Sequence, residues 1–201
     1  PALVALGKKY HLLTMIDEAH ATGVIGKTGH GTLEYFGSAC KPDILMGTLS
    51  KALGSEGGYA CASKVIIDYL KNKARSFIFA TSQAPAALAA ALRAIEVLEE
   101  EPQRAQNLQH NVDFFLNALH AEGVEAYSPT AIIPVIIGDE ATALQVADEL
   151  LANGVLAPAI RYPTVAKGTA RLRIALMATH TETELAQTAK LIGAAIRKHK
   201  K

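Results

Sequence analysis

The sequence predicts an α/β protein, in which short apolar strands alternate with amphipathic helices. The chain has 201 residues, of which 50% are hydrophobic and 19% are charged. This composition supplies a sizeable core and excludes a disordered or collagen-like chain. Several short apolar runs end at an acidic or hydroxyl residue, as buried parallel strands often do. Longer stretches with helical spacing separate these runs.

The first half of the chain reads as a series of short elements. Residues 2–10 have the pattern of a helix that leads into a strand at 12–17, so we expect this chain to be a piece of a longer protein. A glycine-rich loop follows over 23–37. Further strands are expected at 43–48, 57–62 and 76–81, and helices at 63–73 and 85–101, the last opened by Pro85.

The pattern changes at Pro102, where we place a domain boundary between residues 1–101 and 102–201. A helix at 103–120 precedes a compact βαβ pattern. We expect strands at 132–137, 155–160 and 171–177, a helix at 141–153, and a closing helix from Thr181. Thr181 and Glu184 have the spacing of a capping box at the start of that helix.

Charge and cysteine content exclude several classes of function. The formal net charge is +1, with both signs interspersed, which argues against a nucleic-acid or membrane-surface partner. No apolar run reaches the roughly 18 residues that span a bilayer. The only cysteines, Cys40 and Cys61, are far apart in the chain. They favour two buried thiols in a reducing, cytoplasmic setting over a disulfide scaffold or a metal site.

A constellation of reactive side chains follows two of the predicted strands. Asp17 and His20 come at the end of one strand, and Thr48, Ser50 and Lys51 come just beyond the end of another. Ligands of open α/β sheets bind at the carboxyl ends of strands, so we expect these groups to converge there. A lysine amine can attack a carbonyl carbon, and a carboxylate can keep a pyridine nitrogen protonated. These are the parts of a pyridoxal-phosphate site.

Other interpretations of the same residues stay open. Asp17 can merely cap a turn, His20 can be a hydrogen-bonded loop residue, and Lys51 can extend into solvent. Residues 21–28 partly match a phosphate-binding loop and 17–20 an acidic box, but an NTPase places these two motifs on separate strands. Here they abut on one strand, which disfavours nucleotide hydrolysis.

The sequences Asp17–Gly23 and Gly47–Gly54 resemble the α-oxoamine synthases, which are fold-type I pyridoxal-phosphate enzymes. Residues 75–82, 159–165 and 168–173 also fit this family, and the similarity spans essentially the whole chain. The resemblance implies a fold-type I, transferase-like α/β architecture. Residues 1–101 would form part of the large, mainly parallel-sheet domain, and residues 102–201 the small C-terminal α/β domain.

The resemblance also implies roles for individual residues. Lys51 would bind pyridoxal 5'-phosphate covalently and move the substrate α-proton, Asp17 would pair with the pyridinium nitrogen, and His20 would bond the ring oxygen. Thr48 would help to hold the cofactor, and Thr81 would reach the cofactor phosphate of a partner subunit. Arg173 would bind the amino-acid carboxylate, with Thr164 contacting substrate. Arg171 is expected to point to the opposite face of the sheet and to be structural.

Within the family, the chain is most similar to members that condense L-alanine with a pimeloyl thioester in biotin biosynthesis. The implied partners are the amino acid, an acyl thioester on coenzyme A or a carrier protein, and a second subunit that shares the active site. Siblings that use glycine or serine stay open, as does an inactive fragment. Because the glycine-rich phosphate cradle of the family is not among these residues, we expect this segment alone to be poorly active or inactive.

Overall fold

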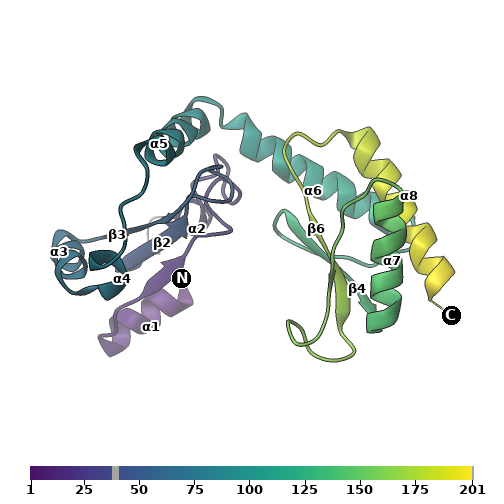
Figure 1. Cartoon of the computed structure of the whole chain (residues 1–201), viewed down its shortest axis with the longest axis horizontal. Helices are drawn as coiled ribbons and strands as arrows, with labels where there is room; N and C mark the ends of the chain where they lie inside the picture. Colours follow the sequence, from purple (N-terminus) through teal and green to yellow (C-terminus); the bar gives the residue numbers. More distant parts are fainter. Residues whose placement is uncertain (38–40, 201) are drawn as a thin grey trace. The chain divides into compact units, whose positions relative to one another are not determined.

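The computed structural model describes residues 1–37 and 41–200, so Cys40 lies outside the described residues. The chain divides into two compact units, Pro1–Ala105 and Gln106–Lys201 (Figure 1). The division falls inside helix α6 (Gln103–Ala121), whereas the sequence analysis places its boundary just before this helix. Below, these parts are called unit 1 and unit 2. Both combine helices with a small sheet, which confirms the α/β class.

Unit 1 is built on a three-stranded sheet in the order β1–β2–β3. Strand β1 (Met15–Asp17) runs parallel to β2 (Ile44–Thr48), and β2 runs antiparallel to β3 (Gly58–Ala62). The helices of this unit that precede α6 are α1 (Ala2–Tyr10), α2 (Thr32–Phe36), α3 (Lys64–Lys73), α4 (Arg75–Ile78) and α5 (Pro85–Glu100). The strands expected at 12–17, 43–48 and 57–62 are therefore present, the first of them shortened.

The parallel pairing of β1 with β2 positions the candidate site. Asp17 pairs with Met46, and the carboxyl ends of both strands meet at one edge of the sheet. Residues that follow the two strands consequently emerge at the same edge. This edge is where an open α/β sheet binds its ligands.

The strand expected at residues 76–81 is absent, and a short helix, α4, lies there instead. In the structure the backbone N–H of Ile78 bonds to Ala74 O and that of Phe79 to Arg75 O. The Arg75 guanidinium lies 5.2 Å from the centre of the Phe79 ring, a contact that helical i, i+4 spacing permits. Local hydrogen bonds thus replace the sheet partner that a strand requires.

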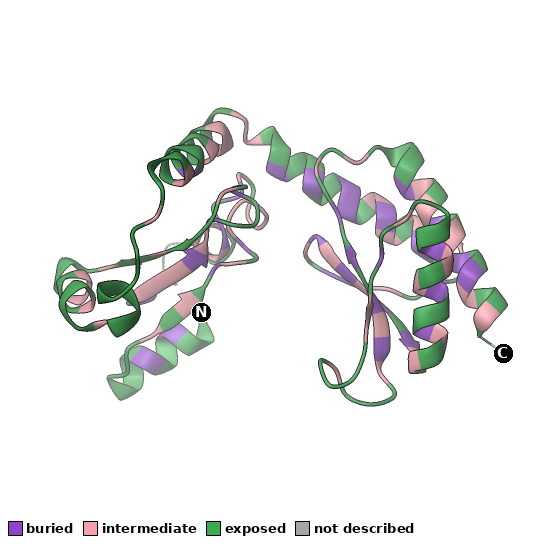
Figure 2. Ribbon diagram, viewed as in Figure 1, coloured by how far each residue is buried: buried purple, intermediate pink, exposed green. Residues whose placement is uncertain are grey.

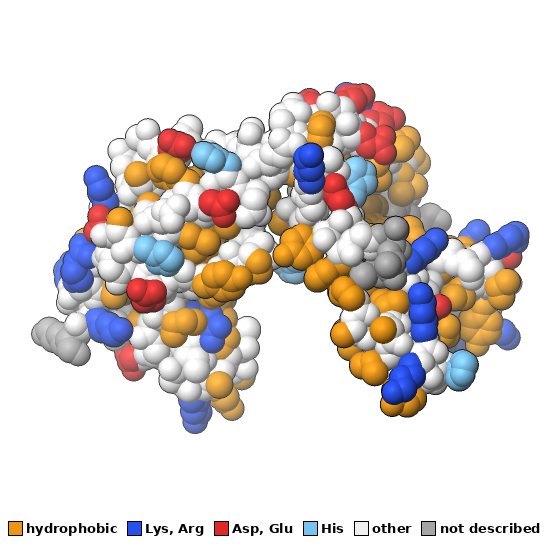
Figure 3. Space-filling model, turned by 180° about the vertical axis from the view of Figure 1, so that it is seen from behind, with side chains coloured by type: hydrophobic (Ala, Val, Ile, Leu, Met, Phe, Trp, Pro, Cys, Tyr) orange, Lys and Arg blue, Asp and Glu red, His pale blue; other side chains and the backbone are white. Residues whose placement is uncertain are grey.

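Unit 1 leaves much apolar surface exposed. Helix α1 exposes Leu3, and the chain around β1 exposes Leu13 and Met15, although the sequence predicted a buried strand here. Figure 2 shows how few residues of this unit are buried, and Figure 3 shows hydrophobic side chains on its surface. Cys61 on β3 is also exposed, so the expectation of a buried thiol is wrong for this residue. Strand β3 is an outer strand of the described sheet.

Unit 2 contains an antiparallel sheet in the order β4–β6–β5. Its strands are β4 (Ile132–Gly138), β5 (Ala159–Ile160) and β6 (Ala170–Ala175), and its helices after α6 are α7 (Glu140–Ala152) and α8 (Glu182–His199). Helix α7 packs on all three strands and on α8. The core includes Phe115, Ile133, Leu172 and Ile192, each 0% exposed.

Local sequence signals explain most boundaries in unit 2. The capping box of α8 is confirmed, because the Thr181 side chain accepts from Glu184 N and the Glu184 carboxylate accepts from Thr181 N. Helix α7 begins after Asp139, whose carboxylate accepts from Thr142 N. The strand expected at 155–160 is reduced to Ala159–Ile160. Pro158, just before it, lacks the N–H that a ladder needs.

Candidate active site

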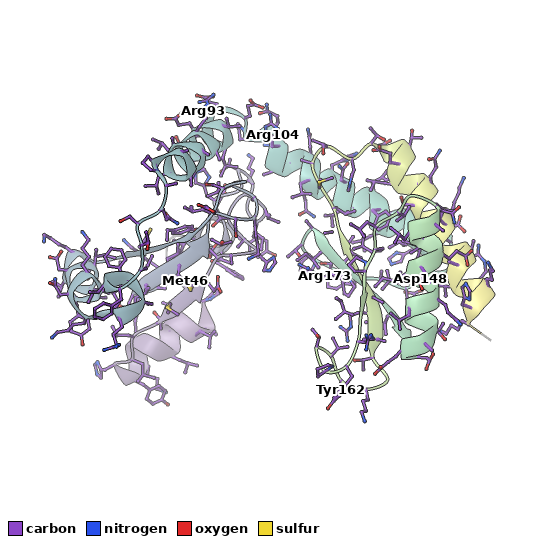
Figure 4. The ribbon with its side chains drawn as sticks, viewed as in Figure 1. Met46, Arg93, Arg104, Asp148, Tyr162 and Arg173 are labelled. Carbon is purple, nitrogen blue, oxygen red and sulfur yellow. The ribbon has the colours of Figure 1, made fainter. Side chains whose placement is uncertain are left out.

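Four of the predicted site residues lie on or just beyond the shared edge of β1 and β2. Asp17 is the last residue of β1, and Thr48 is the last residue of β2. His20 follows β1 by three residues, and Lys51 follows β2 by three residues. Met46, labelled in Figure 4, is the β2 residue that pairs with Asp17. The topology thus brings the acid, the imidazole, the hydroxyl and the amine to one end of the sheet.

Lys51 is carried by a tight turn with a fixed backbone. Leu49 N–H bonds to Gly57 O at 3.0 Å, and Gly54 N–H bonds to Lys51 O at 3.0 Å. Leu49 and Leu53 are buried in a small cluster with Ala91. The Lys51 side chain itself is exposed, and none of the described residues forms a hydrogen bond or ion pair with it. Buried leucines on both sides therefore anchor a turn that presents a free amine.

The Thr48 hydroxyl holds this turn together. It donates to Gly57 O at 3.0 Å, lies 2.7 Å from Ser50 Oγ, and accepts from Ser50 N–H at 3.2 Å. These bonds join the end of β2 to the residues that precede β3. The role of Thr48 in this structure is thus to shape the loop that carries Lys51.

The turn after β1 is held by Asp17 and by a buried acid, Glu18. Asp17 is exposed, and its Oδ1 accepts from Ala19 N–H at 2.8 Å. Glu18 is only 2% exposed. Its backbone N–H bonds to Met46 O at 2.7 Å, and its carbonyl accepts from Ala21 N–H at 2.8 Å. Both strands are therefore tied to the turn that carries His20, whose side chain is exposed.

The Glu18 carboxylate fixes the start of α2. It accepts from the backbone N–H and the hydroxyl of Thr32. Gly31 has φ +80, and a Cβ there would lie 2.0 Å from Glu18 Oε2. A glycine is consequently required at this position, both for its backbone angle and for the space that the acid occupies.

A second acid, Glu34, organises the rest of the glycine-rich loop. Its carboxylate accepts from Thr28 N–H, the Thr28 hydroxyl and His30 N–H. Desolvation by burial acts to raise the pKa of Glu34, but the hydrogen bonds from His30 and Thr28 outweigh it and lower the pKa below its usual value. The loop after β1 is thus held in one conformation by two hydrogen-bonded carboxylates.

Thr81 lies between α4 and α5, and its side chain is exposed. The same segment packs against the loop after Lys51: Gln83 Nε2 donates to Glu56 O at 3.2 Å, and Ser55 Oγ donates to Ala87 O at 2.6 Å. Gly57 has φ +95, and a Cβ there would overlap Gln83 Nε2. The chain before α5 therefore lies beside the Lys51 loop.

Unit 2 carries the two remaining predicted residues. Arg173 is exposed on β6 and is labelled in Figure 4. Thr164 is exposed in the loop between β5 and β6, where its N–H bonds to Arg161 O at 3.0 Å.

The expectation that Arg171 faces away from Arg173 is wrong. Side chains alternate along a strand with a period of two, so residues two apart share a face. In β6, Ala170, Leu172 and Ile174 are buried, whereas the two arginines lie on the other face. Both arginines line one cavity of about 450 Å³ in unit 2, together with Pro134, Ile160 and other residues.

The polar loop Tyr127–Thr130 forms one wall of this cavity. Ser128 is buried, and its hydroxyl donates to Ile132 O at 2.7 Å. The Ser128 hydroxyl also accepts from Thr130 N–H at 3.1 Å. This wall is therefore fixed by its own hydrogen bonds. Among the described residues, no group of three or more histidine, cysteine or acidic side chains is arranged to hold a metal ion.

Residues 1–192 match the family model for aminotransferase class I and II. The chain belongs to this family. No helix among the described residues is both long and apolar enough to cross a membrane.

Within this family, two similar curated relatives are 8-amino-7-oxononanoate synthases. The chain is 48% identical over 193 residues to 8-amino-7-oxononanoate synthase 1 of Bacillus subtilis, covering 96% of this chain and 49% of that protein. It is 47% identical over 195 residues to 8-amino-7-oxononanoate synthase of Geobacter metallireducens, covering 96% of this chain and 50% of that protein. The chain thus spans about half the length of the relatives it matches.

Solved structures agree with the fold expected from the sequence. A serine palmitoyltransferase from S. paucimobilis, with a bound PLP–myriocin adduct, superposes with a TM-score of 0.90 at 27% identity, covering 98% of this chain and 50% of that one. An 8-amino-7-oxononanoate synthase from Francisella tularensis gives a TM-score of 0.82 at 29% identity, covering 99% and 59%. The fold is therefore that of fold-type I enzymes, and the resemblance to the α-oxoamine synthases is confirmed.

Sequence reasoning missed two features of the site. Glu18 was interpreted only as part of an acidic box, although an acid inside an apolar stretch before a glycine-rich loop already suggests a buried carboxylate that needs donors. Arg171 was assigned to the wrong face. The strict alternation of Ala170–Ala175 contained the signal that places both arginines together.

Proposed function

We propose that this chain is part of a pyridoxal-phosphate enzyme that condenses L-alanine with a pimeloyl thioester. The products would be 8-amino-7-oxononanoate, carbon dioxide and the free thiol, as a step of biotin biosynthesis. The observation that carries this proposal is the position of two residues at one end of the sheet: Asp17 ends β1, and Lys51 follows β2, the parallel neighbour of β1. The names of relatives that are 43–48% identical support the choice of substrates.

The side chains at this edge fit pyridoxal phosphate. Among the described residues, no hydrogen bond reaches the Lys51 amine or the His20 imidazole, and Asp17 uses only Oδ1, on Ala19 N–H. An amine, an imidazole and a carboxylate oxygen are thus available to a ligand. When bound, the cofactor supplies an aldehyde for the amine and a ring that accepts electrons from the substrate α-carbon.

Each residue has a distinct task in this proposal. Asp17 would keep the ring nitrogen protonated, and His20 would bond the ring oxygen. The Lys51 amine would hold the cofactor before the reaction and then move the proton at the alanine α-carbon.

Further residues would orient the phosphate and the substrate. Thr48 would stand near the cofactor phosphate, while Thr81 would reach the phosphate of a cofactor held by a partner subunit. Arg173 would bind the alanine carboxylate through its guanidinium fork. Thr164 would contact substrate from unit 2.

The reaction balances without an external oxidant or reductant. A carbon–carbon bond forms between the alanine α-carbon and the thioester carbonyl carbon, and the carbon–sulfur bond breaks to release the thiol. The alanine carboxyl group leaves as carbon dioxide, and a proton takes its place on the α-carbon. The Lys51 amine would remove the first proton and return the last, and the leaving thiolate would take one proton from solvent.

The working enzyme in this proposal is a cytoplasmic homodimer with shared active sites. Its thioester is carried by coenzyme A or by an acyl-carrier protein. Because the chain spans about half of its relatives, the segment alone would have little or no activity.

Turnover by the full-length protein tests the proposal. The cofactor-loaded protein is assayed with alanine, glycine and serine, each combined with pimeloyl, acetyl, succinyl and palmitoyl thioesters. We expect alanine with pimeloyl thioester to give the highest kcat/KM and to release carbon dioxide in equal amount. Preference for glycine or serine would instead assign the protein to a sibling activity.

A further inference from the structure

The cavity of unit 2 contains more positive charge than one substrate carboxylate requires. Arg171 and Arg173 both line it, and none of its lining residues is acidic. Among the described residues, Arg173 has no hydrogen bond or ion pair to its side chain. Arg171 uses only Nε, which donates to Thr169 O at 3.0 Å. Most of the guanidinium donors on this face are therefore available to a ligand.

The chain around the cavity shows the same imbalance. Residues 150–181 contain Arg161, Lys167, Arg171 and Arg173 but no aspartate or glutamate, although the whole chain carries a net charge of only +1. Residues 126–138, which include β4, contain no charged side chain. The two arginines therefore have no acidic residue in the chain segments that surround them to neutralise their charge. Such a surface suits an anionic ligand.

The rest of the lining is apolar. Pro134 lies opposite Arg173 across the β4–β6 pair, and Ile160 lies opposite Arg171 across the β5–β6 pair. Directly opposed residues share a face of the sheet, so both apolar side chains lie beside the arginines. With its volume of about 450 Å³, the cavity suits a ligand that combines an apolar chain with negative charge.

One carboxylate is satisfied by one guanidinium fork, which leaves the second arginine for a second anion. The name of the relatives indicates what that anion is. Their name refers to 8-amino-7-oxononanoate, which carries its amine and ketone near one end and a carboxylate at the other. Removing the carbons that alanine contributes leaves a seven-carbon acyl group that ends in a carboxylate.

We propose that Arg171 binds the carboxylate at the far end of the acyl group, while Arg173 binds the amino-acid carboxylate. This inference rests on the proposed function and adds the residue that selects its acyl substrate. The two Cα atoms are about 6.6 Å apart along the strand, so the two long side chains can hold separate anions. An acyl chain without a terminal acid leaves Arg171 with no anion to bind. Arg171 therefore discriminates a dicarboxylic acyl group from a simple fatty acyl group.

Direct binding tests the inference without turnover. Binding of pimelate and of heptanoate, which differ only by the terminal carboxylate, is measured by calorimetry on the full-length protein. We expect pimelate to bind about tenfold or more tightly than heptanoate. Arg171→Gln is expected to abolish this preference while heptanoate binding stays unchanged. Arg161→Gln, which removes an exposed cation outside the cavity lining, is the matched control and should keep the preference.

Further variants separate charge from geometry and one arginine from the other. Arg171→Lys, which keeps the charge but loses the fork, should give an intermediate preference, and circular dichroism checks that each variant is folded. Arg173→Gln should raise KM for alanine and keep the preference for pimelate. A pimelate preference that survives Arg171→Gln, or one that Arg173→Gln abolishes, would overturn the assignment.

The anion that Arg171 binds could instead be a phosphate of coenzyme A, which is the alternative to the carboxylate of the acyl group. Binding of coenzyme A without an acyl group is therefore measured with the same variants. We expect Arg171→Gln to leave it unchanged, and an equal loss of coenzyme A and pimelate binding would contradict the proposal. If the protein prefers pimelate to heptanoate through Arg171 but does not condense alanine, the proposed reaction is wrong and this inference stands. If the protein condenses alanine but Arg171→Gln keeps the preference for pimelate, this inference is wrong and the proposed reaction stands.

Discussion

Glu18 stands between two candidate site residues, Asp17 and His20, and its contacts differ from theirs. Asp17 and His20 are exposed, whereas Glu18 is 2% exposed and its carboxylate is bonded to Thr32. A buried carboxylate is tolerated only when donors replace its water. We conclude that Glu18 is a structural anchor for the turn that carries His20.

Replacing Glu18 tests this anchor. Glu18→Ala leaves the part-buried donors of Thr32 without this acceptor, so the free energy of unfolding should fall by about 1–3 kcal/mol. Glu18→Gln keeps one acceptor oxygen and should cost less. Urea denaturation measures both, and Glu99→Ala on the exposed side of α5 is the control. Equal stability of Glu18→Ala and the control would contradict the anchoring role.

For single residues, the sequence predicted where the candidate site residues lie on the sheet. It did not predict the hydrogen bonds of Glu18 or the face on which Arg171 lies. Asp17 and Thr48 were expected at one edge because parallel strands end together, and they lie there. The role of Glu18 depends on Thr32, fourteen residues away, which no local pattern reveals. The placement of Arg171 was wrong because the alternation of its strand was misapplied, although the pattern itself was readable.

Elements were predicted well where their boundaries carry local signals. The capping box of α8 and the proline at the start of α5 both mark helices that the structure contains. Residues 76–81 were predicted as a strand, yet α4 forms there because its hydrogen bonds close locally. A strand depends on a neighbour elsewhere in the chain, and a short apolar run does not reveal whether that neighbour exists.

Helices α7 and α8 are joined by an ionic cluster that makes a prediction about pH. Lys198 Nζ and His199 Nε2 lie 2.9 and 2.6 Å from Glu149 Oε2. Hydrogen bonds from Lys198 and His199 lower the pKa of Glu149 below its ordinary value of 4.5. A carboxyl whose pKa is depressed on folding contributes stability above pH 4.5, and this contribution disappears as the pH falls through the folded pKa.

We therefore expect the free energy of unfolding to fall on acidification below pH 4.5, and to fall less steeply in Glu149→Gln. Thermal unfolding followed by circular dichroism between pH 3 and 7 measures both slopes. Asp148→Asn, an exposed neighbour on α7, is the control and should behave as the parent chain. An acid slope that Glu149→Gln leaves unchanged would show that the cluster contributes nothing.

At the scale of the whole molecule, exposed apolar side chains distinguish the chain from a self-sufficient domain. Leu3 is 79% exposed, Leu13 74%, Val65 79% and Leu156 80%. Composition alone did not locate them. Exposed apolar groups and unpaired strand edges promote association.

The chain by itself should consequently self-associate. We expect its apparent mass in light scattering to rise with concentration and a hydrophobic dye to bind it. Leu13→Lys, beside the edge strand β1, should reduce both effects, because a charge at an edge opposes pairing. A chain that stays monomeric at all concentrations and binds no dye would contradict this account of its surface.

The central claim is that the amine of Lys51 is the group that bonds the cofactor. The most direct measurement is borohydride reduction of the full-length protein loaded with pyridoxal phosphate, followed by peptide mapping. We predict that the phosphopyridoxyl group is found on Lys51, and that Lys51→Ala abolishes this labelling while the neighbouring lysines stay unmodified. Stoichiometric labelling of any other lysine would contradict the claim.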